Sequence, residues 1–298
     1  MPGIPPLSPP PVLVLIDGHA YAYRAFHAIR ELSAPDGSPT NGIFGFIKAV
    51  QKIRTRCQPT HMAVIWDGGL DSQRVEALPA YKAQRPAMPD SLSVQIGELT
   101  RWLPAAGIHS ICVEGTEADD LIATAALRAE GMEVVIASAD KDFMQLVGPH
   151  IRLLNPNDKT EVLWGDAQVR TKSGVNPNQI VDWLSLMGDA VDNIPGADHI
   201  GPKTAAALLA RYDTLDHLLE RVDELESERQ RASLVAASAQ LRLNQQLVRL
   251  RSDLPLPVEP QAMRLMQPDT KALCDFYEHK GFRTLLQEAA KARQADLF

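Results

Sequence analysis

Short apolar segments alternate with amphipathic stretches along the first 155 residues, and this alternation constrains the fold most strongly. The apolar segments are rich in Val and Ile and only four to six residues long, which is typical of parallel strands buried on both faces. We expect strands at Val12–Ile16, Met62–Trp66, Val134–Ser138 and Ile151–Leu154, with a further short one at Ser110–Val113. Helices are expected between them at Tyr21–Arg30, Ile43–Arg56, Leu92–Ala106 and Ala118–Glu130. The pattern predicts an α/β fold with helices on both faces of a parallel sheet.

From about Pro177 onward the sequence indicates helices alone, and no convincing strand follows Leu163. The expected helices are Asn178–Met187, Lys203–Tyr212, Leu215–Arg221, Glu228–Leu250 and one or two within Asp269–Arg293. We therefore predict an α/β core over residues 12–175 and a helical region over residues 176–298. We expect residues 1–11 to form a Pro-rich, flexible tail, since they lack the basic and apolar regions of a signal peptide.

Composition excludes several classes of protein. The longest apolar run after the first prolines, Val12–Ile16, is far shorter than the roughly 18 residues of a membrane span. Three widely spaced cysteines, Cys57, Cys112 and Cys274, imply neither a disulfide framework nor a zinc site. These features favour a cytoplasmic protein without a membrane partner.

Acidic residues follow three of the expected strands. Asp17 comes directly after the first strand, Asp67 after the second, and Asp140 and Asp142 just after a third. Because parallel strands end at one edge of their sheet, where ligands of open α/β folds bind, we expect these carboxylates to share one crevice.

Two more acidic groups do not directly follow an expected strand. Glu117, Asp119 and Asp120 occupy the first turn of an expected helix, where the helix dipole alone favours acids. Asp189 and Asp192 are three residues apart in a turn-forming segment, a spacing that an ordinary Asx-rich loop also has. Each group has this structural interpretation when taken alone, but nine converging carboxylates would repel one another strongly without cations.

The nine carboxylates therefore predict a site for divalent cations. Ligands that are all oxygen, with no His or Cys, favour Mg²⁺ or Mn²⁺ over Zn²⁺. Two such ions roughly 4 Å apart are a common device for phosphate-ester cleavage. The net charge of −7 would otherwise argue against a nucleic-acid ligand, since phosphate binders are usually basic. Acids gathered in one site remove that objection.

Seven ordered segments carry a resemblance to a known family: Leu15–Phe26, Thr40–Phe46, Tyr81–Pro86, Glu117–Asp120, Asp140–Leu146, Gly188–Gly196 and Ile200–Ala205. From about Val12 to Leu218, and more weakly to the C-terminus, the chain resembles the 5′-nuclease domain of bacterial DNA polymerase I and, more broadly, the flap endonuclease family. The resemblance implies a nuclease core of the PIN type, a helical arch over about residues 70–95, and a helix–hairpin–helix over about residues 188–212.

The resemblance also implies a role for each acid, because all nine fall on metal-site positions of the family. A first metal ion would be served by Asp17, Asp67, Glu117, Asp119 and Asp120. A second would be served by Asp142, Asp189 and Asp192, with Asp140 close to both. The expected catalytic set is these nine acids together with Lys82, which would offset charge on the scissile phosphate.

Basic and aromatic residues near the acids are expected to contact DNA. Four of them stand in the implied arch: Arg74, Tyr81, Lys82 and Arg85. Tyr81 would stack on a base, although the stretch also has the composition of an ordinary solvated basic face. Arg24 and Tyr21 follow the first strand and are further candidates, a core position being equally consistent for Tyr21.

The implied helix–hairpin–helix would hold a duplex phosphate at the N-terminus of a helix. Its candidate DNA contacts are Gly196, Gly201, Lys203 and Thr204. In relatives, carbonyls of this turn bind K⁺, but His199 stands here where the family usually has glycine. If that position has a positive φ, His199 is strained, so K⁺ binding depends on how this turn folds. The other histidines, His19 among them, show no ligand spacing and are interpreted as structural or surface residues.

These features predict a structure-selective 5′-nuclease, both 5′–3′ exonuclease and flap endonuclease, that uses two metal ions on 5′ flaps and on nicked or gapped duplexes. Okazaki-fragment processing and DNA repair are the implied processes. We expect a monomer near the bacterial nucleoid, either as a separate protein or as the excised N-terminal part of DNA polymerase I. Two alternatives stay open: a PIN-type ribonuclease, usually about half this length, and a catalytically weak DNA-binding module.

Overall fold

A five-stranded parallel sheet in the order β3-β2-β1-β4-β5 forms the centre of the molecule. The structure is a computed structural model that describes residues 9–295, so most of the predicted tail over residues 1–11 lies outside the described residues. The strands are β1 (Val12–Asp17), β2 (His61–Trp66), β3 (His109–Cys112), β4 (Glu133–Ala137) and β5 (Ile151–Leu154). All five lie where the sequence predicts strands, and the predicted α/β class is confirmed.

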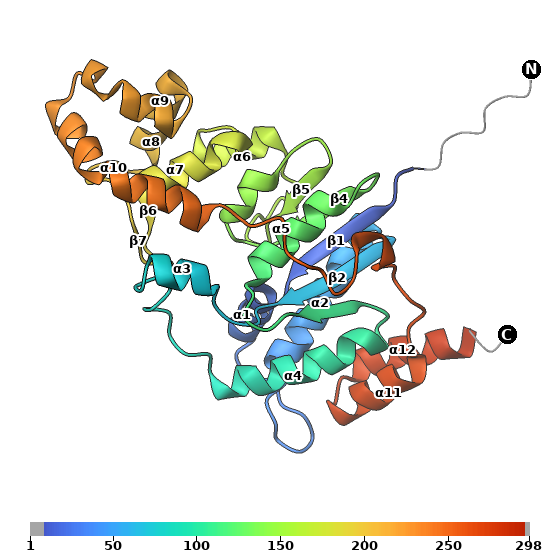
Figure 1. Ribbon diagram of the computed structural model, residues 1–298. Coiled ribbons are helices and arrows are strands. Elements are labelled where there is room, and N and C mark those ends of the chain that lie inside the picture. Colours follow the sequence, from blue (N-terminus) through green and yellow to red (C-terminus); the bar gives the residue numbers. More distant parts are fainter. Residues whose placement is uncertain (1–8, 296–298) are drawn as a thin grey trace, which may run out of the picture.

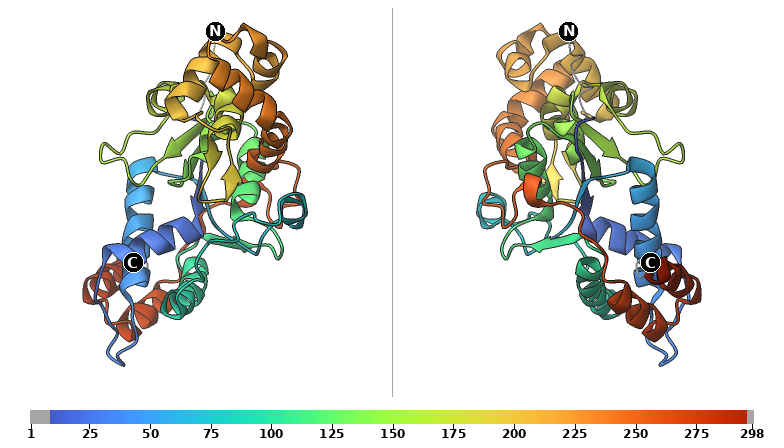
Figure 2. Two further views of the ribbon diagram at one scale, coloured as in Figure 1. Left: turned by 90° about the vertical axis from the view of Figure 1, so that its left-hand side faces the viewer. Right: turned by 90° about the vertical axis from the view of Figure 1, so that its right-hand side faces the viewer.

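Helices cover both faces of the sheet (Figures 1 and 2). One face packs against α1 (Gly18–Ala28), α2 (Asn41–Cys57), α4 (Asp90–Ala105), α11 (Thr270–His279) and α12 (Arg283–Ala295). The other face packs against α5 (Ala118–Arg128), the 3-10 turn Asp142–Leu146, α6 (Asp166–Ser173) and α7 (Ile180–Met187).

The residue pattern of β1 explains this two-sided packing. Leu13 and Leu15 belong to the hydrophobic cluster on the α5 side, whereas Val14 and Ile16 belong to the cluster on the α2 side. Successive side chains of a strand point to opposite faces, so an unbroken apolar segment requires cover on both sides.

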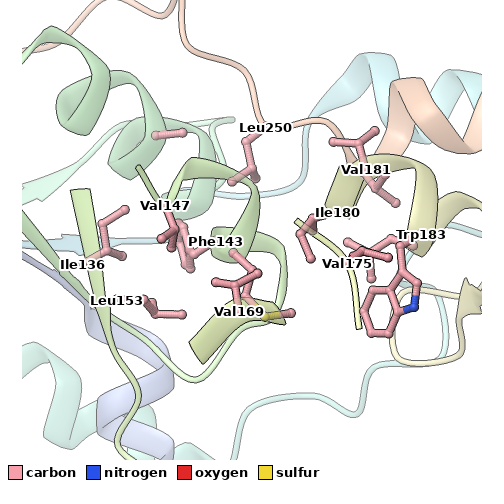
Figure 3. Close-up of a cluster of buried hydrophobic side chains, with 14 of the residues drawn as sticks. Ile136, Phe143, Val147, Leu153, Val169, Val175, Ile180, Val181, Trp183 and Leu250 are labelled. Carbon is pink, nitrogen blue, oxygen red and sulfur yellow. The ribbon is translucent and has the colours of Figure 1, made fainter. Parts of the chain in front are cut away.

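The helical region contains α7, α8 (Pro202–Tyr212), α9 (Leu215–Glu220) and α10 (Glu228–Val248). Figure 3 shows that its hydrophobic cluster continues from the sheet across the predicted boundary near residue 175. Ile136 and Leu153 of the sheet belong to the same cluster as Val175, Ile180 and Trp183. The two regions therefore share one core, which fixes the position of the helical region relative to the sheet edge.

Three features differ from the sequence-based expectation. Two short paired strands, β6 (Gly188–Asp189) and β7 (Ile194–Pro195), lie beyond Leu163, where no strand is expected. Local sequence patterns also do not indicate α6, and α3 (Ser72–Ala77) falls within the helical arch that only the resemblance implies. Finally, α11 and α12 return to the α/β core and pack beside α4 and α2, although residues 176–298 were expected to form one helical region.

Close backbone contact explains the unexpected β6–β7 pair. A Cβ atom on Gly196 would lie 2.3 Å from the carbonyl carbon of Met187, and Gly188 has a φ of 73°. Only glycine tolerates both conditions without strain. The pair therefore holds the Asp189–Asp192 turn firmly in place.

The implied arch over residues 70–95 is only partly helical. It consists of α3, a series of turns near Pro79–Gln84, an irregular stretch to Pro89 and the start of α4 (Figure 1). Among residues 9–295, no helix combines the length and the apolar character needed to cross a membrane. The three cysteines are free.

Candidate active site

The carboxyl-terminal edge of the sheet gathers the acids that follow the strands. Asp17 is the last residue of β1, Asp67 directly follows β2, and Asp140 lies three residues beyond β4. The N-terminus of α5 adds Asp119, which is close enough to Asp140 and Asp17 for both to raise its pKa, although burial is the largest cause. The common strand direction therefore brings these four carboxylates together.

Asp17 is held rigidly within this edge. Its Oδ1 accepts a hydrogen bond from the backbone N–H of Ala20 (3.0 Å), and its Oδ2 accepts one from the hydroxyl of Ser138 (2.9 Å). Burial raises the pKa of Asp17 to about 7 in spite of these bonds, and the nearby charges of Asp67 and Asp140 raise it further. The two hydrogen bonds do not offset this burial, and a nearby cation would stabilise the anionic form further.

A second acidic group adjoins the first through Asp140. Burial is the largest cause of the raised pKa of Asp142, and the charges of Asp140, Asp192 and Asp189 add to it. The Oδ1 atom of Asp142 is buried and has no hydrogen-bond partner among the described residues. Burial also raises the pKa of Asp140, whose Oδ1 accepts a hydrogen bond from the backbone N–H of Asp142 (2.9 Å). The acids thus form two groups that share Asp140.

Basic side chains neutralise several of these acids directly. Lys82 Nζ lies 3.0 Å from Glu117 Oε1, and Lys141 Nζ lies 3.0 Å from Asp189 Oδ2. Arg85 Nη2 lies 2.6 Å from Asp192 Oδ1. Burial opposes the charge of Lys82, but Glu117 and the other acids outweigh it, so its pKa is raised.

The acids do not form a ready-made metal cage in this arrangement. Nowhere in residues 9–295 do three or more His, Cys, Asp or Glu side chains lie together in a way that could hold one metal ion directly. Repulsion between like charges and the ion pairs of Lys82, Lys141 and Arg85 account for this spacing. The donors nevertheless fit Mg²⁺ or Mn²⁺, since all are carboxylate oxygens and Asp142 Oδ1 has no other partner.

Arg74 does not lie where a DNA contact requires it. Its side chain is buried and donates hydrogen bonds to Glu117 Oε2 (2.6 Å), to both oxygens of Asp120 and to the carbonyl of Arg249. Asp120 Oδ1 also accepts a hydrogen bond from the backbone N–H of Arg251 (2.8 Å). The structure therefore gives Arg74 and Asp120 a structural role, and does not support the predicted DNA contact of Arg74 or the predicted metal role of Asp120.

Two predicted stacking residues are also buried. Tyr81 is only 4% exposed, and its hydroxyl donates a hydrogen bond to Glu117 Oε2 (3.1 Å). Tyr21 is equally buried and packs in the hydrophobic cluster on the α2 face. Since stacking on a base needs an open ring face, the structure does not support the predicted base contacts of these two residues.

Lys82, a further predicted DNA contact, is also buried, whereas the remaining predicted contacts are exposed or half-buried. Arg24, Arg85, Gly201 and Lys203 are exposed, and Gly196 and Thr204 are half-buried. Gly201 caps α8, and a Cβ atom there would meet no atom within 4 Å, so the backbone N–H groups at the start of α8 are open to a ligand.

His199 adopts the positive φ that the sequence analysis named as a source of strain at this position. Its φ is 62°, in the left-handed region that favours glycine, and its ring contacts Nη2 of Arg229 at 2.8 Å. The turn thus keeps a positive φ in spite of the substitution.

Sequence reasoning missed three residues that contact the acids. Ser138 and Lys141 bond Asp17 and Asp189, and Nδ1 of His19 accepts a hydrogen bond from the backbone N–H of Asp67 (3.1 Å). Burial lowers the pKa of His19, which favours the neutral ring that such acceptance needs. The signals available were the positions of Lys141 within Asp-Lys-Asp and of His19 two residues after Asp17.

Nearly the whole described chain matches two consecutive domain families of known proteins. Residues 12–174 match the 5′–3′ exonuclease N-terminal resolvase-like domain, and residues 175–271 match the 5′–3′ exonuclease C-terminal SAM fold. The chain is 35% identical to a 5′–3′ exonuclease of Aquifex aeolicus over 293 residues, covering 96% of this chain and 99% of that protein. It is 38% identical to DNA polymerase I of Rhizobium leguminosarum over 294 residues, covering 95% of this chain but only 29% of the polymerase.

A similar fold occurs in a solved structure. The bacteriophage T5 D15 flap endonuclease, in a complex with DNA and metal ions, superposes with a TM-score of 0.67 at 18% identity, covering 94% of this chain and 98% of that protein.

Proposed function

The chain belongs to the 5′–3′ exonuclease family, and we propose that it is a structure-selective 5′-nuclease that hydrolyses DNA phosphodiesters with two divalent metal ions. The observation that carries this proposal is the pair of buried acidic groups joined at Asp140, whose pKa values are raised by burial and by one another. Buried carboxylates of this kind need a cation, and two divalent ions supply one to each group.

The first ion would be held by Asp17, Asp67, Glu117 and Asp119, and the second by Asp142, Asp189 and Asp192, with Asp140 between them. We assign Asp120 to Arg74 instead, because both of its oxygens accept hydrogen bonds from the guanidinium and one also accepts from the N–H of Arg251, whereas Glu117 Oε1 has only the ion pair with Lys82. Mg²⁺ or Mn²⁺ bound here would activate a water molecule and stabilise the leaving oxygen.

The chain's own residues prepare this site for a phosphodiester. Ser138 and the N–H of Ala20 orient the two oxygens of Asp17. Lys82 lies among the acids with its ammonium group 3.0 Å from Glu117, where it can turn to a negatively charged oxygen of the scissile phosphate. Arg85 pairs with Asp192, and Lys141 pairs with Asp189. We propose that these two cations also contact the phosphates of the DNA strand that is cut.

DNA with a 5′ flap, a nick or a gap is the proposed substrate, cut both internally and from the 5′ end. The open N-terminus of α8 would hold a duplex phosphate with Lys203, as helix N-termini do for anions. The T5 relative of similar fold is in a complex with DNA and metal ions. Removal of 5′ strands in Okazaki-fragment processing and DNA repair would follow from this activity, carried out by a monomer. The K⁺ proposed at the hairpin turn would have to bind despite the strained His199.

Cleavage of a 5′-labelled double-flap DNA, in Mg²⁺ and in EDTA, tests this function. We expect a product cut at or next to the flap junction, seen with Mg²⁺ only. A ladder of mononucleotides would show that the exonuclease mode dominates. A shifted band without any product would contradict the nuclease proposal and favour a DNA-binding module.

A further inference from the structure

Helix α2 carries an unusual concentration of positive charge for this acidic chain. Its 17 residues include four basic residues and no acidic one, whereas the whole chain has 37 acidic and 30 basic residues. Lys48, Lys52 and Arg56 are spaced four residues apart and exposed, so they form one line on a single helix face at steps of roughly 6 Å. We call these three residues the α2 ridge.

The ridge borders two surface hollows. A pocket of about 350 Å³ on one side is lined by Lys52 and Arg56 together with Arg24 of α1 and Lys159 of the loop after β5. A hollow on the other side is lined by Lys48, Lys52 and Arg54. Only three acids, Asp158, Glu161 and Glu288, line either hollow, so positive charge prevails along the ridge.

The loop after β5 closes over the ridge by means of one acidic residue. Glu161 forms an ion pair with Lys52, and its carbonyl accepts a hydrogen bond from Arg56 Nε (3.4 Å). Glu161 itself has a φ of 55°, an uncommon conformation for this residue type. A phosphate would compete directly with Glu161 for the same two cations.

Arg24, which lines the same pocket as Lys52 and Arg56, links the ridge to the edge of the sheet where the acids lie. Arg24 is seven residues beyond Asp17 on α1, or roughly 10 Å along the helix axis. Figure 2 shows α2 on the flank of the sheet, away from the helices α8–α10. We therefore expect a nucleic acid with its reacting phosphate at the acids to meet Arg24 first and then the ridge, on a different side of the molecule from α8.

We propose that the α2 ridge, with Arg24 and Lys159, binds the sugar–phosphate backbone of a second duplex arm of the substrate. This inference rests on the proposed function and names a surface for it. The chemistry recognised is the phosphate backbone alone, since the described lining contains basic groups and no array of aromatic rings that would stack on bases. Such contacts position DNA without reading its sequence.

The test is the salt dependence of binding to a nicked duplex DNA, measured by fluorescence anisotropy in EDTA so that no cleavage takes place. The triple variant Lys48→Ala/Lys52→Ala/Arg56→Ala is compared with the wild type. Each phosphate contact contributes about 0.9 to the slope of log K against log salt. We therefore expect the slope to fall by about 2 to 3 and the affinity to weaken by about tenfold or more.

A matched control removes three positive charges that line neither of the two hollows. Arg128 ends α5, Arg264 pairs with His61 at the start of β2, and Lys271 lies near Asp269, which bonds the end of α4. The variant Arg128→Ala/Arg264→Ala/Lys271→Ala should keep the wild-type slope. An unchanged slope in the ridge variant, or an equal fall in both variants, would overturn the proposal.

A further variant, Glu161→Gln, tests whether removal of a negative charge beside the ridge strengthens DNA binding. Without its competing carboxylate, the ridge should bind the nicked duplex about two- to fivefold more tightly, and unchanged or weaker binding would contradict the proposal.

The double-flap cleavage assay distinguishes failure of the proposed function from failure of the ridge proposal. A wild type that neither cuts nor binds DNA contradicts the proposed function, whereas normal cutting with an unaltered ridge slope contradicts only the ridge.

Discussion

The guanidinium of Arg74 faces the carboxylate of Asp120 in a buried bidentate pair, with donor–acceptor distances of 2.7 and 2.8 Å. Arg251 extends this pair, because its backbone N–H also donates to Asp120 and its side chain donates to Asp71 (2.9 Å). The network therefore joins the α3 segment, the N-terminus of α5 and the chain that follows α10. It anchors the base of the implied arch beside the acids.

Replacing Arg74 by Ala should destabilise the protein strongly. The change leaves Glu117 and Asp120 buried with their main cation removed, and breaking one side of a buried ion pair costs about 3–5 kcal/mol. Urea unfolding measures the loss. Arg101→Ala is the control, because that side chain is 75% exposed and pairs with Glu98 at the surface, which is worth less than about 1 kcal/mol. Equal losses in the two variants would refute the structural role of Arg74.

Lys82→Ala should slow cleavage far more than it weakens DNA binding. Lys82 lies among the acids instead of on the surface, so under the proposed function it would offset charge at the reacting phosphate, where one such group is worth about 10²–10³-fold in rate. Single-turnover cleavage rates and DNA affinity, measured separately, distinguish an effect on catalysis from an effect on binding. Lys203→Ala, on the exposed start of α8, should show the reverse pattern. A parallel loss of rate and affinity in Lys82→Ala would make it a simple anchor.

Without metal, the acidic site should make the protein less stable as the pH rises. The folded-state pKa of Asp17 is about 7 against an ordinary value of 3.8, so the folded state binds more protons between these values. Stability therefore falls as pH increases from about 4 to 7. Melting temperatures in EDTA should show this trend for the site, and Mg²⁺ or Mn²⁺ should raise the melting temperature more at pH 7.5 than at pH 5. A metal effect that is equal or larger at pH 5 would contradict the raised pKa values.

His199→Gly should stabilise the protein slightly. Glycine adopts a φ near 62° without the steric cost that a side chain carries, so we expect a gain of about 0.5–1 kcal/mol, reduced by the lost contact with Arg229. His217→Gly is a useful contrast, since it places glycine inside α9 and should cost about 1 kcal/mol. Chemical denaturation distinguishes the two signs, and a destabilised His199→Gly would show that the Arg229 contact outweighs backbone strain.

The sheet and the edge that gathers the acids were predictable because both follow from local patterns. Strands such as β1 are continuous apolar segments, and an acid directly after a parallel strand can lie only at the carboxyl-terminal edge. The return of α11 and α12 to the α/β core was not predictable in this way. It depends on contacts such as that between Trp102 Nε1 and the Tyr277 hydroxyl (3.0 Å), which join residues 175 positions apart.

The partners of the charged residues were equally hidden from the sequence. The sequence analysis predicted that Arg74 and Lys82 contact DNA from the arch, yet both side chains are buried against Glu117. A sequence shows the charge of a side chain but not the direction in which a turn points it, and Lys82 has a positive φ of 53° that no local pattern indicates. The ion pairs of the site could therefore be identified only from the three-dimensional structure.

The most direct test of the proposed two-metal site is the single-turnover cleavage rate of Asp119→Asn and Asp189→Asn, one variant for each acidic group, on a flap DNA at saturating Mg²⁺. We predict that each variant loses cleavage by about 10³-fold or more while remaining folded, with a melting temperature in EDTA no lower than that of the wild type, because each change removes a repelling charge. Cleavage at the wild-type rate by either variant would contradict the assignment of that group to a catalytic metal ion.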